Sequence, residues 1–143
     1  MKKILTITCL ASIVLLNCSK SSDPAATVTL VGTWLQTSES ISNCATPSQN
    51  VAEAPCTTCA TLVLKVDASG AGSSTYTNSI GPTSGIWGPG GPITDPTGTI
   101  NFQPTGGVPS GFIPYTQTAT TLTLTYENLA GPSCKTILKF TRQ

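Results

Sequence analysis

The clearest hydrophobic pattern in this chain is an alternation of apolar and polar residues with a period of two. Residues 121–127 (TLTLTYE) place Leu122, Leu124 and Tyr126 on one face and mainly threonine on the other. Such alternation is typical of a β-strand that is buried on one face only. The segment therefore predicts a strand of an antiparallel sheet whose leucines face the core.

Two further segments repeat this pattern. Residues 61–67 (TLVLKVD) point Leu62, Leu64 and Val66 inward. Residues 134–142 point Thr136, Leu138 and Phe140 inward. Turn-forming residues (NLAGP) precede this last segment and predict a hairpin. About eight short strands without a helical period favour an all-β domain, either a barrel or a sandwich. The remaining predicted strands are residues 29–38, 72–80, 84–88, 97–103 and 110–117.

Glycine and proline dominate residues 81–114, which contain nine Gly and seven Pro among 34 residues. These residues break helices and confine strands to short or edge pieces. Apolar residues such as Trp87, Ile100 and Phe112 supply anchors to a core. We therefore expect bent strands and turns here rather than a disordered insert.

The beginning of the chain has a different pattern. Lys2 and Lys3 precede a mainly apolar run of thirteen residues, 4–16, which is too short to span a bilayer core. Cys18 then follows Asn17. The segment resembles the signal peptide of bacterial lipoproteins, although that family usually has a small residue in place of Asn17. The resemblance implies that Cys18 receives thioether-linked diacylglycerol and, after cleavage, an N-acyl chain such as palmitate. The alternative is an ordinary secretory signal or an uncleaved anchor.

The lipoprotein resemblance divides the chain into three parts. Residues 1–17 are the signal peptide, residues 18–27 are the lipidated Cys18 with a flexible polar tether, and residues 28–143 are the folded domain. The lipid makes the membrane a partner and places the protein in the cell envelope. Ser19 rather than Asp follows the lipidated cysteine, which favours the outer membrane under the sorting rule known for some bacteria.

Composition limits the chemistry of the domain. From Cys18 onward, five basic residues stand against six acidic ones, so there is no basic field for nucleic acid. The chain has no His, which removes the usual activating base for Ser or Cys nucleophiles and the commonest metal ligand. The acidic residues are scattered and lie in no catalytic motif. We therefore expect no enzymatic activity, no catalytic residues, and no cofactor or metal.

Four cysteines, Cys44, Cys56, Cys59 and Cys134, lie in the folded domain. An even number in an exported chain favours two disulfides, for which three pairings are possible. The alternative is a zinc site or a redox pair in the sequence CTTC. Zinc ribbons usually carry two close cysteine pairs, and redox C-x-x-C motifs begin a helix in a βαβ unit. Neither context is present, so we predict structural disulfides.

The sequence LVGTWLQ near the start of the domain resembles the first strand of lipocalins and related barrels. In that class the G-x-W motif, here Gly32 and Trp34, closes one end of an eight-stranded up-and-down barrel, and an Arg from the last strand packs across the Trp ring. Arg142 lies two residues after Phe140 and has the parity for this role. Avidin-type barrels share GTW but line their biotin site with several Trp, whereas Trp87 is the only other one here. The resemblance therefore implies a small lipocalin-like antiparallel barrel and disfavours biotin.

The same resemblance implies where the cysteines lie. A first strand that rises from the closed end and a last strand that descends to it bring residues 39–59 and Cys134 together at the open end. We expect residues 39–59 to form a long loop without secondary structure, held by the two disulfides. At least one disulfide then joins this loop to the last hairpin. Cys134 is predicted to pair with Cys56 or Cys59, because the close C-x-x-C pair is poorly placed to bridge itself.

Two functions fit such a barrel. The first is binding of a small apolar ligand inside it, with entry at the open end. The second is a structural or interaction role, in which the barrel is filled by its own side chains and its loops contact another macromolecule, whose nature the sequence does not indicate. An open interior of roughly a few hundred Å³ favours the first function, which we expect. The inward residues are the candidates for ligand binding: Leu62, Leu64, Leu122, Leu124, Tyr126 and Phe140.

Overall fold

The computed structural model describes residues 27–143, in which nine β-strands and one 3₁₀ turn are found. The predictions for the signal peptide, Cys18 and most of the tether lie outside the described residues. Within residues 27–143, no helix has the length and apolar character needed to cross a membrane. The elements in chain order are β1 (Gly32–Ser42), η1 (Pro47–Gln49), β2 (Val51–Pro55), β3 (Thr61–Val66), β4 (Gly72–Asn78), β5 (Gly81–Pro89), β6 (Thr97–Pro104), β7 (Ile113–Gln117), β8 (Thr121–Glu127) and β9 (Lys135–Arg142).

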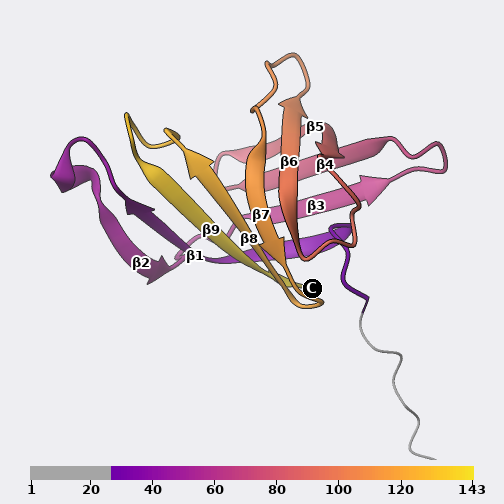
Figure 1. The fold of residues 1–143 in the computed structure, drawn as a ribbon, viewed down its shortest axis with the longest axis horizontal. Helices are drawn as coiled ribbons and strands as arrows, with labels where there is room; N and C mark the ends of the chain where they lie inside the picture. The colour runs from indigo at the N-terminus through magenta and orange to yellow at the C-terminus, as the bar shows by residue number, and fades with distance from the viewer. Residues whose placement is uncertain (1–26) are drawn as a thin grey trace, which may run out of the picture.

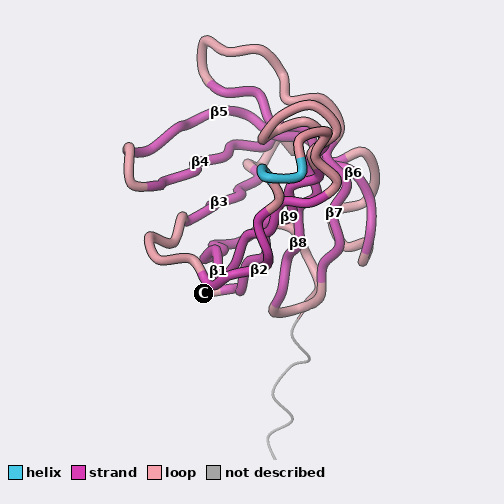
Figure 2. Tube along the Cα trace, turned by 90° about the vertical axis from the view of Figure 1, so that its left-hand side faces the viewer, coloured by secondary structure: helices cyan, strands magenta, loops and turns pink. Residues whose placement is uncertain are grey.

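Eight of these strands form a closed antiparallel barrel. Strands β3 to β9 pair with their neighbours in chain order, and β1 pairs with β3 on one edge and with β9 on the other. Figures 1 and 2 show the strands wrapping around one interior. The prediction of an all-β, up-and-down barrel is confirmed. The sandwich alternative is wrong, because the pairing of β1 with β9 closes the sheet on itself.

The two ends of the barrel differ in their loops. We call the end that holds the start of β1 and the end of β9 the floor, and the loops from β3 to β4, β5 to β6 and β7 to β8 lie there. The opposite end is the mouth. It carries the loops from β4 to β5, β6 to β7 and β8 to β9, together with the β1–β2 connection.

Strand β1 changes partner half-way along its length. Its residues 32–35 pair with β3, whereas residues 38–41 pair with β2 on the same edge. β1 pairs with β9 along most of its length, with a bulge between Gln36 and Ser38. The part of β1 nearer the mouth, with β2 and the start of β9, therefore extends past the barrel, to the left in Figure 1. We call this extension the arm.

The expectation that residues 39–59 form a loop without secondary structure is wrong, because they include the end of β1, η1 and β2. All five residues of β2 (VAEAP) are exposed, so the strand lacks the alternation that marks the others. Its order comes from pairing with β1 and from Glu53. The Glu53 carboxylate accepts hydrogen bonds from the Lys139 ammonium at 2.7 and 2.8 Å and from the Ser38 hydroxyl at 2.8 Å. These bonds, that of Lys139 first, lower the pKa of Glu53.

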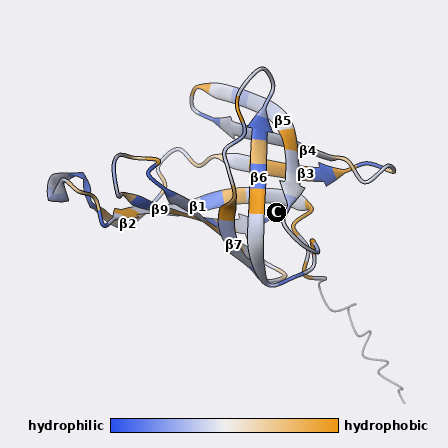
Figure 3. Cartoon of the chain, turned by 45° about the horizontal axis from the view of Figure 1, so that its top comes forward, coloured by the Kyte–Doolittle hydropathy of each residue, from blue (hydrophilic) through white to orange (hydrophobic). Residues whose placement is uncertain are grey.

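The apolar faces predicted from the alternation form the core. Leu62, Leu64, Leu122, Leu124 and Phe140 are each at most 2% exposed. Tyr126, at the mouth end of β8, is only partly buried. Val66, the last residue of β3, is 39% exposed and does not join the core as predicted. Figure 3 shows the same alternation along β6, where apolar and polar residues follow one another.

The Gly/Pro-rich segment is ordered into β5, β6 and their connections, as expected. Trp87 and Ile100 are buried in the core, whereas Phe112 is exposed on the β6–β7 loop and does not anchor the segment as predicted. Gly98 of β6 lies opposite Tyr115 of β7. A Cβ at Gly98 would lie 2.9 Å from the Tyr115 hydroxyl oxygen, so only glycine leaves room for the ring.

The floor is closed by Trp34 and Arg142, which are cross-strand partners in β1 and β9. The guanidinium carbon of Arg142 lies 4.1 Å from the centroid of the Trp34 ring. Trp34 is fully buried, and its Nε1 donates a hydrogen bond of 2.9 Å to the carbonyl oxygen of Leu30. This is the geometry that the lipocalin resemblance implies. A cation–π contact of this kind contributes about 1 kcal/mol, and more where it is desolvated.

The Arg142 guanidinium also ties three chain segments together. Its nitrogens donate hydrogen bonds to the carbonyl oxygens of Thr29, Val31 and Ala119, the last two at 2.8 Å. Gly32 lies beneath the guanidinium with a φ of 153°, and a Cβ at this position would collide with Arg142. The first residues of the described chain, the β7–β8 turn and the end of β9 are thus held by one side chain.

Arg142→Ala is expected to lower the free energy of unfolding by about 1–3 kcal/mol, because it uncovers Trp34 and leaves three carbonyl oxygens without their donor. Urea denaturation measures this change. Lys139→Ala is the matched control, since it removes a cation from the same strand but breaks only an exposed ion pair. Its expected cost is below about 1 kcal/mol. Equal losses in both variants would contradict the role of Arg142 at the floor.

Candidate ligand-binding site

A cavity of about 310 Å³ opens at the mouth of the barrel. Four of the predicted ligand candidates line it, namely Leu62, Leu124, Tyr126 and Phe140. Leu64 and Leu122 do not line it, because they lie nearer the floor in the packed core. The other lining residues are Ser74, Tyr76, Thr83, Ser84, Gly85, Phe102, Pro104, Val108, Ser110, Leu129 and Leu138.

Two tyrosines bring polar atoms to this mostly apolar cavity. Burial, with a smaller effect of Tyr76, raises the pKa of Tyr126 to about 12. Burial and, second, the Glu39 carboxylate raise the pKa of Tyr76. Both phenols therefore keep their protons at neutral pH and can donate hydrogen bonds. The Tyr76 hydroxyl is 3.4 Å from Oε1 of Gln36, a long hydrogen bond that a ligand can replace.

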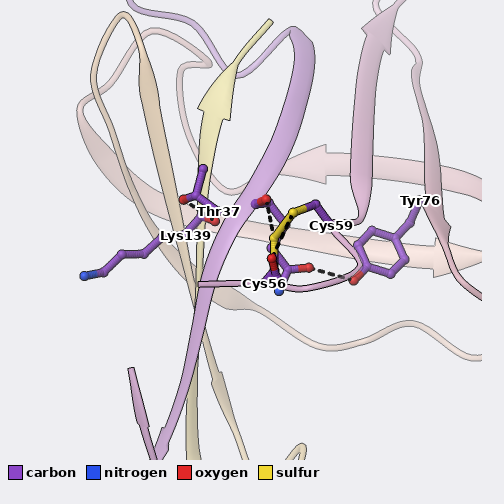
Figure 4. The surroundings of a disulfide bond; sticks show 6 residues. Thr37, Cys56, Cys59, Tyr76 and Lys139 are labelled. Carbon is purple, nitrogen blue, oxygen red and sulfur yellow. Dashed lines mark hydrogen bonds between the residues drawn. A yellow bond between two sulfur atoms is a disulfide. The ribbon is translucent and has the colours of Figure 1, made fainter. Parts of the chain in front are cut away.

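A second hollow of about 480 Å³ lies beside the cavity, against the arm. Gln36, Glu39 and Ile41 of β1 line it, as do residues of β2 and the corner that follows. We call this hollow the groove. Tyr76 lines both the cavity and the groove and so marks where they adjoin. Figure 4 shows Tyr76 directed toward the corner that holds Cys56 and Cys59.

The bulge in β1 decides which side chains face the groove. Before the bulge, Trp34 and Gln36 point inward. After it, Glu39 is the cross-strand partner of inward-facing Leu138, while Ser38 pairs with outward-facing Lys139. An uninterrupted alternation from Trp34 would put residues 36, 38 and 40 on the inner face and turn Glu39 outward. The extra residue in the bulge exchanges the inward-facing and outward-facing positions that follow it, as a one-residue slip does in any strand.

Two disulfides form at the mouth end of the molecule, as predicted. Cys44 is bonded to Cys134, with their Cα atoms 4.0 Å apart, and this bond joins the β1–β2 connection to the last hairpin. Cys56 is bonded to Cys59, with Cα atoms 5.2 Å apart. The zinc alternative is excluded, because both disulfides consume the thiols. No cluster of three metal-ligating side chains occurs in the part of the chain that the structure describes.

The predicted pairing of Cys134 with Cys56 or Cys59 is wrong. β1 continues to Ser42, which pairs with Lys135, so Cys44 and Cys134 lie just beyond the last rung of the same ladder. The chain then turns back at residues 56–60, between β2 and β3, and this corner brings Cys56 and Cys59 together. The backbone amide of Cys56 donates a hydrogen bond of 3.0 Å to the carbonyl oxygen of Thr37, which holds the corner against the bulge (Figure 4).

The long disulfide is expected to contribute more stability than the short one. Cys44 and Cys134 are 90 residues apart, whereas Cys56 and Cys59 are three apart. The chain-entropy relation gives about 4–5 kcal/mol for the first loop and about 2 kcal/mol for the second. The free energies of unfolding of Cys44→Ala/Cys134→Ala and Cys56→Ala/Cys59→Ala measure this difference. A smaller loss for the first double variant would contradict the assigned pairing.

No protein-family model, curated protein or solved structure matches this chain. The closed eight-stranded barrel is shown by its strand pairing. Membership of the lipocalin class stays an interpretation based on Gly32, Trp34 and Arg142.

Proposed function

We propose that this protein is a lipid-anchored protein of the bacterial cell envelope whose barrel binds a small apolar ligand without converting it. The observation that carries this proposal is the cavity of about 310 Å³ at the mouth. Binding pockets for small molecules are typically about 300–1,000 Å³, concave and lined mainly by apolar side chains, with a few polar groups that orient the ligand. A barrel filled by its own side chains would lack such a space.

The division of the barrel into floor and mouth supports this function. Trp34 and Arg142 seal the floor, so a ligand enters and leaves at the mouth. Leu62, Leu124, Leu138 and Phe140 supply apolar contact, and the Tyr126 phenol supplies a hydrogen-bond donor at the rim. The absence of His from the chain is consistent with binding rather than catalysis.

A lipid on Cys18 suits this arrangement. Leu30 donates a backbone hydrogen bond to the carbonyl oxygen of Ile93 and lies at the floor beside Arg142, so the tether joins the barrel there. Nine peptide units separate Cys18 from Thr27, which allows a reach of at most about 30 Å. A membrane anchor would therefore keep the floor of the barrel within about 30 Å of the lipid surface.

An interaction role is the second candidate, and exposed apolar residues at the mouth favour it. Ile80, Val108, Phe112 and Leu129 are 60–94% exposed and lie on the β4–β5, β6–β7 and β8–β9 loops. Val108 and Leu129 also line the cavity, so they serve equally as the rim of a ligand site. The binding experiment described next separates the two roles.

Ser74→Phe is expected to weaken binding of the neutral fluorescent probe N-phenyl-1-naphthylamine at least about tenfold, because the added ring fills the cavity. Ser74 is buried and lines the cavity, whereas Ser73 points outward on the same strand. Ser73→Phe is therefore the matched control and should bind the probe as the parent protein does. Absence of probe binding by the parent, or equal binding by both variants, would favour the interaction role.

Cys18→Ala is expected to abolish labelling of the protein by an alkyne analogue of palmitate during growth, because it removes the predicted acceptor thiol. Cys9→Ala is the control, since too little apolar sequence precedes Cys9 for it to be the lipidated residue. This variant should be labelled normally. Label that persists in Cys18→Ala would contradict the lipid anchor.

A further inference from the structure

One carboxylate stands out at the mouth. Glu39 is the only charged residue among those that line the cavity or the groove. It is solvent-exposed, and among residues 27–143 the one ion pair found is that of Glu53 with Lys139. Lys139 lies across β1 from Ser38, on the outer face, whereas Glu39 lies across from Leu138 on the inner face. The arm thus presents one unpaired negative charge to the interior side of the mouth.

The groove and the cavity share Tyr76 as a lining residue and differ in polarity. Four leucines and two phenylalanines are among the residues that line the cavity, and the groove carries the polar groups of Gln36 and Glu39. Tyr76 borders both, and its phenol lies close enough to the Glu39 carboxylate for that charge to raise its pKa. A ligand that fills both hollows therefore meets apolar side chains at one end and a negative charge at the other.

We propose that the ligand is a small cationic amphiphile, with its apolar chain in the cavity and its ammonium head in the groove facing Glu39. This inference rests on the proposed function of ligand binding. An ammonium group supplies the counter-charge that Glu39 lacks, whereas a fatty-acid carboxylate in the same place would be repelled. A neutral alcohol would keep the apolar contact but gain no ion pair. Glu39 accordingly selects the head group, while the cavity supplies most of the affinity.

Calorimetric titration with decylamine, decanol and decanoate tests this proposal, because the three probes share one chain and differ in head charge. Residues 27–143 contain every strand of the closed barrel and its floor, so this segment is used at neutral pH and low salt. Decylamine is expected to bind about three- to tenfold more tightly than decanol, and decanoate more weakly than both.

Variants at two carboxylates identify the charge that is responsible. Glu39→Gln is expected to remove the preference for decylamine without weakening decanol, and Glu39→Lys to reverse the order in favour of decanoate. Glu127→Gln changes the net charge equally, but Glu127 is exposed and lines neither hollow, so this variant should still prefer decylamine. These exposed positions leave the core untouched, and unchanged binding of decanol reports that the barrel is intact.

The outcomes separate this inference from the proposed function. If none of the three probes binds, ligand binding itself is wrong. If all three bind with equal affinity, or if Glu39→Gln keeps the preference for decylamine, the barrel binds apolar chains but Glu39 does not select a cationic head. A loss of the preference in Glu127→Gln as large as in Glu39→Gln would assign it to overall charge and would also overturn the inference.

Discussion

The pairing of β1 with β9 is the constraint on which the rest of this structure depends. It closes the barrel, and it brings Trp34 and Arg142 together at the floor. At the other end of the same ladder it places Cys44 next to Cys134. The bulge within the ladder turns Glu39 toward the groove, and the length of β1 beyond the barrel supplies the edge on which β2 is built.

The two ends of this ladder use opposite physical means. At the floor, a partly buried cation is held without a carboxylate partner, by carbonyl oxygens from three segments and by the face of an indole ring. Desolvation lowers the pKa of Arg142, and these fixed dipoles compensate for the lost water. At the mouth, covalent bonds replace packing. The disulfides hold the arm where the exposed residues of β2 contribute no core.

Strands with one buried face could be predicted from the sequence, because the core imposes a period of two on segments such as Thr121–Glu127 and Thr61–Val66. β2 left no such signal, since neither of its faces meets the core. The bulge that turns Glu39 inward also left no signal in the hydrophobic pattern. The spacing of the cysteines along the chain led to the wrong disulfide pairing. The register between β1 and β9 explains the observed pairing. Ten residues separate Trp34 from Cys44 and eight separate Cys134 from Arg142, and the bulge absorbs one of the two extra residues.

Closure by β1 and β9 also determines how late the barrel can form. Arg142 bonds the carbonyl of Val31 across 111 residues, so contacts of high sequence separation decide folding, and such topologies fold slowly. Until β9 has been synthesised, β1 and β8 both expose unpaired edges, which are sites of aggregation. The threonines on the outer face of β8 keep that intermediate sheet polar. Substitutions that weaken the pairing of β1 with β9 will therefore reduce the yield of folded protein more than they change what the folded barrel binds.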